Sequence, residues 1–161
     1  METELILRIF AERRVECLLI GGMNFLLRHR PVLTYDVDFW VGDTNDNLAR
    51  TADALYQLGA QWGPDDKSWA PIPPGIEWLQ RQSVYCLTTD HGAIDIFREV
   101  RGLEGQFKAC WDRGVESQTA GGIAFRGLSD HDMLSCQLAL PAGEQKAERV
   151  AYLQALLGSK S

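Results

Sequence analysis

A run of alternating apolar and acidic residues constrains this chain more than any other feature. Residues 34–41 read TYDVDFWV, and side chains alternate between the two faces of a strand. Val37 and Phe39 therefore share one face, and Asp36 and Asp38 share the other. Aspartate is depleted in strands and is seldom buried without a partner. The pair indicates either an exposed edge strand with solvated acids or a divalent-cation site, because carboxylate oxygens are preferred ligands of magnesium.

A third acid occupies a similar position further along the chain. Residues 83–88 and 93–97 are predicted to form a hairpin with its turn at residues 89–92. In the segment GAIDIF, Ile94 and Ile96 share the face expected to be buried, and Asp95 lies on the other. Taken alone, Asp95 is more typical of a solvent-exposed strand position. Together with the first pair, it would provide enough carboxylates for two metal ions, as in many phosphoryl-transfer sites.

A glycine pair precedes the acidic strand. Gly21 and Gly22 end the apolar run of residues 15–20 and precede a predicted helix over residues 24–30. Glycine permits positive φ and close approach of the backbone to a ligand, and free N–H groups at a helix start favour phosphate. A tight strand-to-helix turn would also require glycine for steric reasons alone. The pair therefore indicates either a phosphate cradle or a turn.

Length and composition indicate one α/β or α+β domain. The chain has 161 residues, of which 45% are hydrophobic and 24% charged, as in ordinary globular proteins. Its net charge of −6 argues against a broad electrostatic grip on nucleic acid. No apolar run reaches the roughly 18 residues of a membrane span, so we expect a cytoplasmic protein without a membrane partner. Each of the four cysteines stands alone within an apolar segment, and their spacing is not that of a zinc site. We therefore expect reduced thiols at Cys17, Cys86, Cys110 and Cys136.

The remaining pattern predicts a small mixed sheet flanked by helices, ending in a helical pair. Further helices are predicted by apolar periodicity and capping residues at residues 2–14, 45–58, 103–113, 129–140 and 143–157. Gly122 begins a predicted short strand that ends at residue 126. Residues 60–78 contain four prolines and three tryptophans, which predicts an ordered loop over a groove. The tryptophans either pin this loop to the core or stack a base.

Together, these residues resemble the nucleotidyltransferase superfamily of the DNA polymerase β type. Its pattern is Gly-Gly or Gly-Ser, then Asp-hydrophobic-Asp on the next strand, then a third acid on a later strand. The sequence GGMNFLLRHRPVLTYDVDF is similar to the small bacterial branch that includes toxins of type IV abortive-infection systems, with Thr34 in place. The segments IDIFREVRGLEGQF and GIAFRGLSDHDML extend the likeness, which covers residues 15–157.

The resemblance implies a magnesium-dependent transfer of a nucleoside monophosphate from a nucleoside triphosphate to a hydroxyl group. Two Mg²⁺ ions would be held by the catalytic residues Asp36, Asp38 and Asp95. The residues expected to contact the nucleotide are Gly21, Gly22, Thr34 and, from its place after the glycine turn, Arg28. The acceptor stays open between RNA, a protein and a small molecule, as does the oligomeric state.

Two departures from the branch pattern favour a second hypothesis. Val32 stands where the branch often has arginine, and Gln137 where it often has lysine. Only part of the charged run that opens the final helix is present, as Lys146, Glu148 and Arg149. Fewer cations would weaken the binding of triphosphate. The alternative is therefore a catalytically weak or inactive binding module of the same fold, such as a toxin–antitoxin component. A metal-dependent phosphohydrolase is disfavoured because the sequence shows no histidine-rich ligand set.

Overall fold

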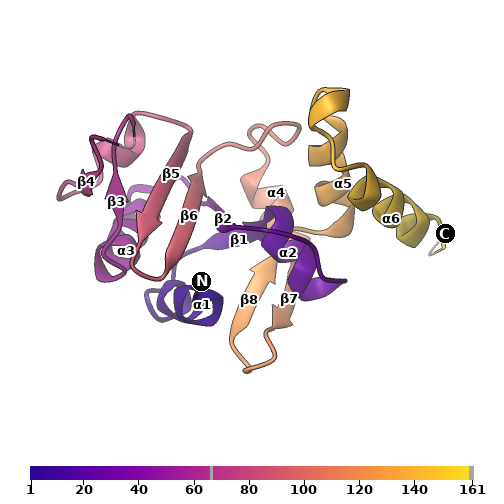
Figure 1. Ribbon diagram of the computed structural model, residues 1–161, viewed down its shortest axis with the longest axis horizontal. Coiled ribbons are helices and arrows are strands. Elements are labelled where there is room, and N and C mark those ends of the chain that lie inside the picture. The colour runs from indigo at the N-terminus through magenta and orange to yellow at the C-terminus, as the bar shows by residue number, and fades with distance from the viewer. Residues whose placement is uncertain (66, 160–161) are drawn as a thin grey trace.

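A computed structural model describes residues 1–65 and 67–159. Across these residues the chain forms one eight-stranded mixed sheet in the order β4-β3-β5-β6-β2-β1-β8-β7 (Figure 1). The strands are β1 (Cys17–Ile20), β2 (Asp36–Val41), β3 (Gln61–Trp62), β4 (Ala70–Pro71), β5 (Val84–Thr89), β6 (Gly92–Phe97), β7 (Val115–Gln118) and β8 (Ala124–Gly127). Helices flank the sheet, and α5 packs with α6 as a C-terminal pair. The predicted α+β class with a C-terminal helical pair is confirmed.

The central strands separate the hydrophobic core into two clusters, one on each face of the sheet. The helices are α1 (Thr3–Glu12), α2 (Gly21–Arg28), α3 (Asn45–Gln57), α4 (Phe107–Asp112), α5 (Asp130–Leu138) and α6 (Ala147–Gly158), with 3-10 turns at Trp78–Gln80 and Ala142–Glu144. Side chains of α1 and α3 pack on one face of the central strands. The other face packs against side chains of α4, α5 and α6. Figure 1 shows α5 and α6 at one end of the molecule and β3 and β4 at the other.

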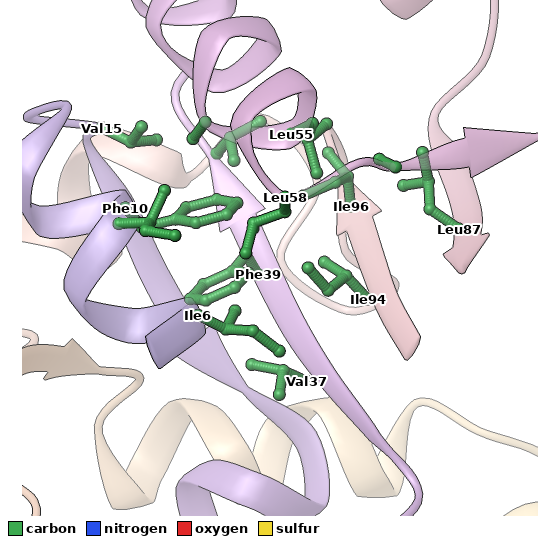
Figure 2. Close-up of a cluster of buried hydrophobic side chains, with 14 of the residues drawn as sticks. Ile6, Phe10, Val15, Val37, Phe39, Leu55, Leu58, Leu87, Ile94 and Ile96 are labelled. Atoms are coloured by element: carbon green, nitrogen blue, oxygen red, sulfur yellow. The ribbon is translucent and has the colours of Figure 1, made fainter. Parts of the chain in front are cut away.

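Strand alternation sets which residues of the central strands reach each cluster. Val37 and Phe39 of β2 and Ile94 of β6 join the cluster under α1 and α3, where Phe10 stacks on Phe39 with ring centroids 4.1 Å apart (Figure 2). Trp40 points to the opposite face and is fully buried there. The acids of β2 share the Trp40 face, as the period of two predicts.

Several boundaries differ from the predictions for identifiable reasons. The acidic strand begins at Asp36, two residues later than predicted, because Asp36 is the first residue that pairs with β6, opposite Ala93. The helix predicted at residues 103–113 is only Phe107–Asp112, because Gly102 and Gly105 have φ values of 89° and 72° and hold the preceding residues in turns. Strand β7 was missed because its sequence, VESQ, is largely polar and exposed.

The tryptophan-rich segment extends the sheet and closes one end of the core. It contributes the short strands β3 and β4 beside β5. Trp62, Trp78 and Tyr85 form an aromatic cluster, with ring centroids 5.2 to 6.1 Å apart. Trp78 is buried, which favours the pinning role over base stacking for this residue.

Within the described residues, no helix has both the length and the apolar character required to traverse a bilayer.

Candidate metal and phosphate site

Parallel pairing of β2 with β6 brings the three acids together. Asp38 lies directly opposite Asp95 in the register of these strands, and Asp36 lies opposite Ala93. One carboxylate oxygen from each aspartate lies within 4.8 Å of the others. All three residues are half-buried. The sequence predicted that each acid faces away from the core, and the strand pairing adds that all three face a common point.

The electrostatics of this cluster favour a bound cation. Burial, together with the negative charges of Asp36 and Asp95, raises the pKa of Asp38 to about 7, while Arg149 opposes the shift. Burial and Asp36 raise the pKa of Asp95 to about 6, against a hydrogen bond from Cys86. Ionisation of all three carboxyl groups at this distance is unfavourable unless a positive charge lies nearby. A donor set of carboxylate oxygens fits a hard divalent cation such as Mg²⁺ or Mn²⁺.

The glycine pair lies directly against the acid cluster. Gly21 has a φ of 66°, and a Cβ there would collide with Oδ2 of Asp38. A Cβ at Gly22 would lie only 2.9 Å from Oγ1 of Thr34. Helix α2 begins at Gly21, so its first N–H groups are available for an anion beside the carboxylates. The turn therefore meets the steric requirement, and the start of α2 beside it is a position where a helix favours an anion.

The other two residues expected at the nucleotide lie in different places. Thr34 precedes β2, and its Oγ1 donates a hydrogen bond of 3.4 Å to the Asp36 carbonyl, beside Gly22. Arg28 lies in the last turn of α2, roughly 10 Å along the helix axis from Gly21. Its guanidinium donates to the Leu128 carbonyl at 2.7 Å and pairs with Asp130 at 3.0 Å. The structure thus brings Thr34 to the glycine turn but does not bring Arg28 there.

Two residues outside the predicted site lie near the cluster: Cys86, for which no role was predicted, and Arg149, which belongs to the charged run that opens the final helix. Cys86 is exposed on β5 directly opposite Asp95, a placement that follows from the two-residue turn between β5 and β6. Burial, and to a smaller extent the nearby acids, raise the pKa of its thiol to about 11. Arg149 of α6 lies near Asp38 and Gly22. No local sequence signal reveals this second contact, because it depends on how α6 packs.

A cavity of about 280 Å³ adjoins the acid cluster on the Trp40 face of the sheet. Most of its wall is apolar, and Asp38, Gln137 and Arg149 supply polar groups. Its lining residues are Ile20, Gly21, Asp38, Phe97, Val100, Arg101, Leu128, Met133, Cys136, Gln137, Leu140 and Arg149. An apolar pocket with a few polar groups is typical of a small-molecule site.

Comparisons with known proteins give a structural likeness only. No family model matches the sequence, and no curated protein matches it. The crystal structure of JHP933 from Helicobacter pylori aligns with a TM-score of 0.43 and 14% sequence identity. That alignment covers 96% of this chain and 63% of the JHP933 chain, so this chain spans less than two thirds of its length.

Proposed function

We propose that the protein is a metal-dependent nucleotidyltransferase that moves a nucleoside monophosphate from a nucleoside triphosphate to an acceptor hydroxyl. The observation that carries this proposal is the convergence of Asp36, Asp38 and Asp95 within 4.8 Å beside the turn at Gly21. Carboxylates adjacent to a phosphate cradle suit phosphoryl transfer, in which catalysis is mainly positioning and charge stabilisation. The sequence resemblance supports the same reaction.

Each residue of the site would have a role set by its position. Asp36, Asp38 and Asp95 would hold two Mg²⁺ ions, which supply charge neutralisation at the phosphates and activation of the acceptor. The N–H groups at Gly21 and Gly22 would bind triphosphate oxygens, and the adjacent cavity would take the nucleoside. The acceptor oxygen attacks the α-phosphorus, the bond to the β-phosphate oxygen breaks, and pyrophosphate leaves. Asp95 would receive the hydroxyl proton as the general base.

The position of the transferred label tests this reaction directly. Each nucleoside triphosphate, labelled at the α- or the γ-phosphate, would be incubated with the protein, Mg²⁺, total cellular RNA and a protein extract. We expect label from the α-phosphate in RNA, protein or a small product, no label from the γ-phosphate, and loss of transfer in Asp95→Asn. Transfer of the γ-label, or release of inorganic phosphate instead of pyrophosphate, would indicate a different reaction.

A second candidate function is nucleotide binding without turnover, including a role in a toxin–antitoxin pair. One structural observation favours it. Gln137, at the position where the related branch often has lysine, accepts a hydrogen bond of 2.7 Å from the backbone N–H of Lys146. The side chain thus caps the start of α6 and contributes no cation. Magnesium-dependent nucleotide binding with no transfer to any acceptor fraction would support this candidate over the enzyme.

A further inference from the structure

Arg149 occupies an unusual position between the last helix and the glycine turn. Its Nη2 lies 3.3 Å from where a Cβ of Gly22 would stand. Its guanidinium carbon lies 5.5 Å from the centre of the Phe25 ring. The same side chain lines the cavity together with Asp38. A residue near the C-terminal end of the described chain therefore places its charge beside the candidate site.

The hydrogen-bonding capacity of Arg149 is incompletely used. Its Nε is buried, and among the described residues it has no hydrogen-bond partner. Burial lowers the pKa of Arg149, and the charge of Asp38 opposes this effect. A buried N–H donor without a partner is costly, so such groups often serve a ligand. The guanidinium presents further donors in a planar fork that matches phosphate oxygens.

Other cations near the glycine turn are engaged elsewhere or point into solvent. Arg28 pairs with Asp130, and the Arg30 guanidinium lies 4.9 Å above the Tyr152 ring. Arg101 also lines the cavity, but it is exposed. Of these arginines, Arg149 is the one whose guanidinium lies beside both Asp38 and the turn.

We propose that Arg149 binds the phosphates of the nucleotide and, without nucleotide, serves as the counter-ion of Asp38. This inference rests on the proposed function, because it assigns a role within the same site. A metal ion arriving alone must bind near the positive charge of Arg149, so the protein should bind free cation less tightly than the same site without that charge. A metal–triphosphate complex brings its own anion for Arg149, so both charges are satisfied together. The site would thus favour the loaded nucleotide over the free ion.

Two binding measurements with opposite expected signs test the proposal. Calorimetric titration would compare wild-type protein with Arg149→Met, which keeps an unbranched apolar side chain over Phe25 and removes the charge. For Mn²⁺ alone, we expect Arg149→Met to bind about three- to tenfold more tightly, because a repelling cation has gone. For the magnesium complex of a non-hydrolysable nucleoside triphosphate, we expect at least about tenfold weaker binding.

Two further variants serve as controls. Arg8→Met removes an exposed arginine that pairs only loosely with Glu12 on α1, and both affinities should match the wild type. Arg149→Lys keeps the charge without the planar fork, so Mn²⁺ affinity should stay near that of the wild type while nucleotide affinity falls partly. This variant also preserves the test if Arg149→Met fails to fold, which a thermal scan would reveal.

The outcomes separate this inference from the proposed function. Wild-type affinity for both ligands in Arg149→Met would overturn the inference and leave the proposed function intact. A wild type that binds no magnesium–nucleotide complex would overturn the proposed function and the phosphate-binding role together. In that case, unchanged Mn²⁺ affinity in Arg149→Met would also overturn the counter-ion role.

Discussion

At the scale of single residues, Asp38 links stability to the charge of the site. Its pKa in the folded protein is raised to about 7, whereas an unfolded aspartate titrates near 3.9. Between about pH 4 and pH 7 the folded state therefore binds more protons than the unfolded state. It follows that the free energy of unfolding falls as pH rises through this window.

The corresponding prediction concerns Asp38→Asn. Without metal, we expect this variant to be more stable than the wild type at pH 7.5 by about 1–3 kcal/mol and to be similar or less stable at pH 4. Urea unfolding at several pH values, in the presence of a chelator, measures the difference. If the free energy of unfolding of the wild type rose between pH 4 and pH 7 by more than that of Asp38→Asn, the raised pKa of Asp38 would be refuted.

Gly21 offers a second test at this scale. Gly21→Ala would place a methyl group against Asp38 in a left-handed backbone conformation. We expect a loss of about 1–2 kcal/mol from the backbone alone, and in addition the loss of Mn²⁺ binding. Gly122→Ala is a matched control, because Gly122 has a φ of 82° and no heavy atom within 4 Å of where the new methyl group would stand. It should lose similar stability and keep Mn²⁺ affinity, as judged by urea unfolding and calorimetry. Equal Mn²⁺ affinity in both variants would refute the steric argument.

At the scale of elements, a buried ion pair ties α2 to the start of α5. Asp130 accepts from His29 at 2.8 Å and pairs with Arg28 at 3.0 Å, and all three side chains are almost fully buried. Helix α2 starts at the glycine turn, and α5 supplies Met133 to the cavity wall. This contact therefore fixes the spacing between the turn and the cavity.

Removing the shared acid should be costly. We expect Asp130→Asn to lower the free energy of unfolding by about 3 kcal/mol, because the buried Arg28 loses its counter-charge. Asp112→Asn removes the partner of Lys108 in an exposed pair on α4, and should cost less than about 0.5 kcal/mol. Urea denaturation of both variants gives the comparison. Similar losses in the two variants would show that the buried pair does not hold α2 to α5.

At the scale of the whole molecule, the sequence predicts the features that follow from local periodicity, namely strand faces and helix caps, and does not predict long-range contacts. Alternation in residues 34–41 and in GAIDIF placed each acid on the face opposite the cluster under α1 and α3. Ser129 was correctly predicted to cap α5, where its side chain accepts from the Asp132 N–H. Parallel pairing of β2 with β6 was not predictable from period alone, because α3, β3, β4 and β5 separate these two strands in the chain. The approach of Arg149 depends on the packing of α6, which periodicity does not specify. The engagement of Arg28 by Asp130 likewise depends on a contact about a hundred residues away in the chain.

We propose above that the three acids and the glycine turn together bind a metal–triphosphate complex. Thermal unfolding with each of the four nucleoside triphosphates, with and without Mg²⁺, tests it most directly on wild-type protein and Asp36→Asn. A ligand at ~100 times its dissociation constant stabilises by about 2.7 kcal/mol, which for a chain of this size raises the melting temperature by about 5–10 °C. We expect a shift of this size that requires Mg²⁺, disappears in Asp36→Asn and persists in Asp53→Asn, a change at an exposed position on α3. No shift with any nucleotide at millimolar concentration, or an equal shift in Asp36→Asn, would contradict the proposal.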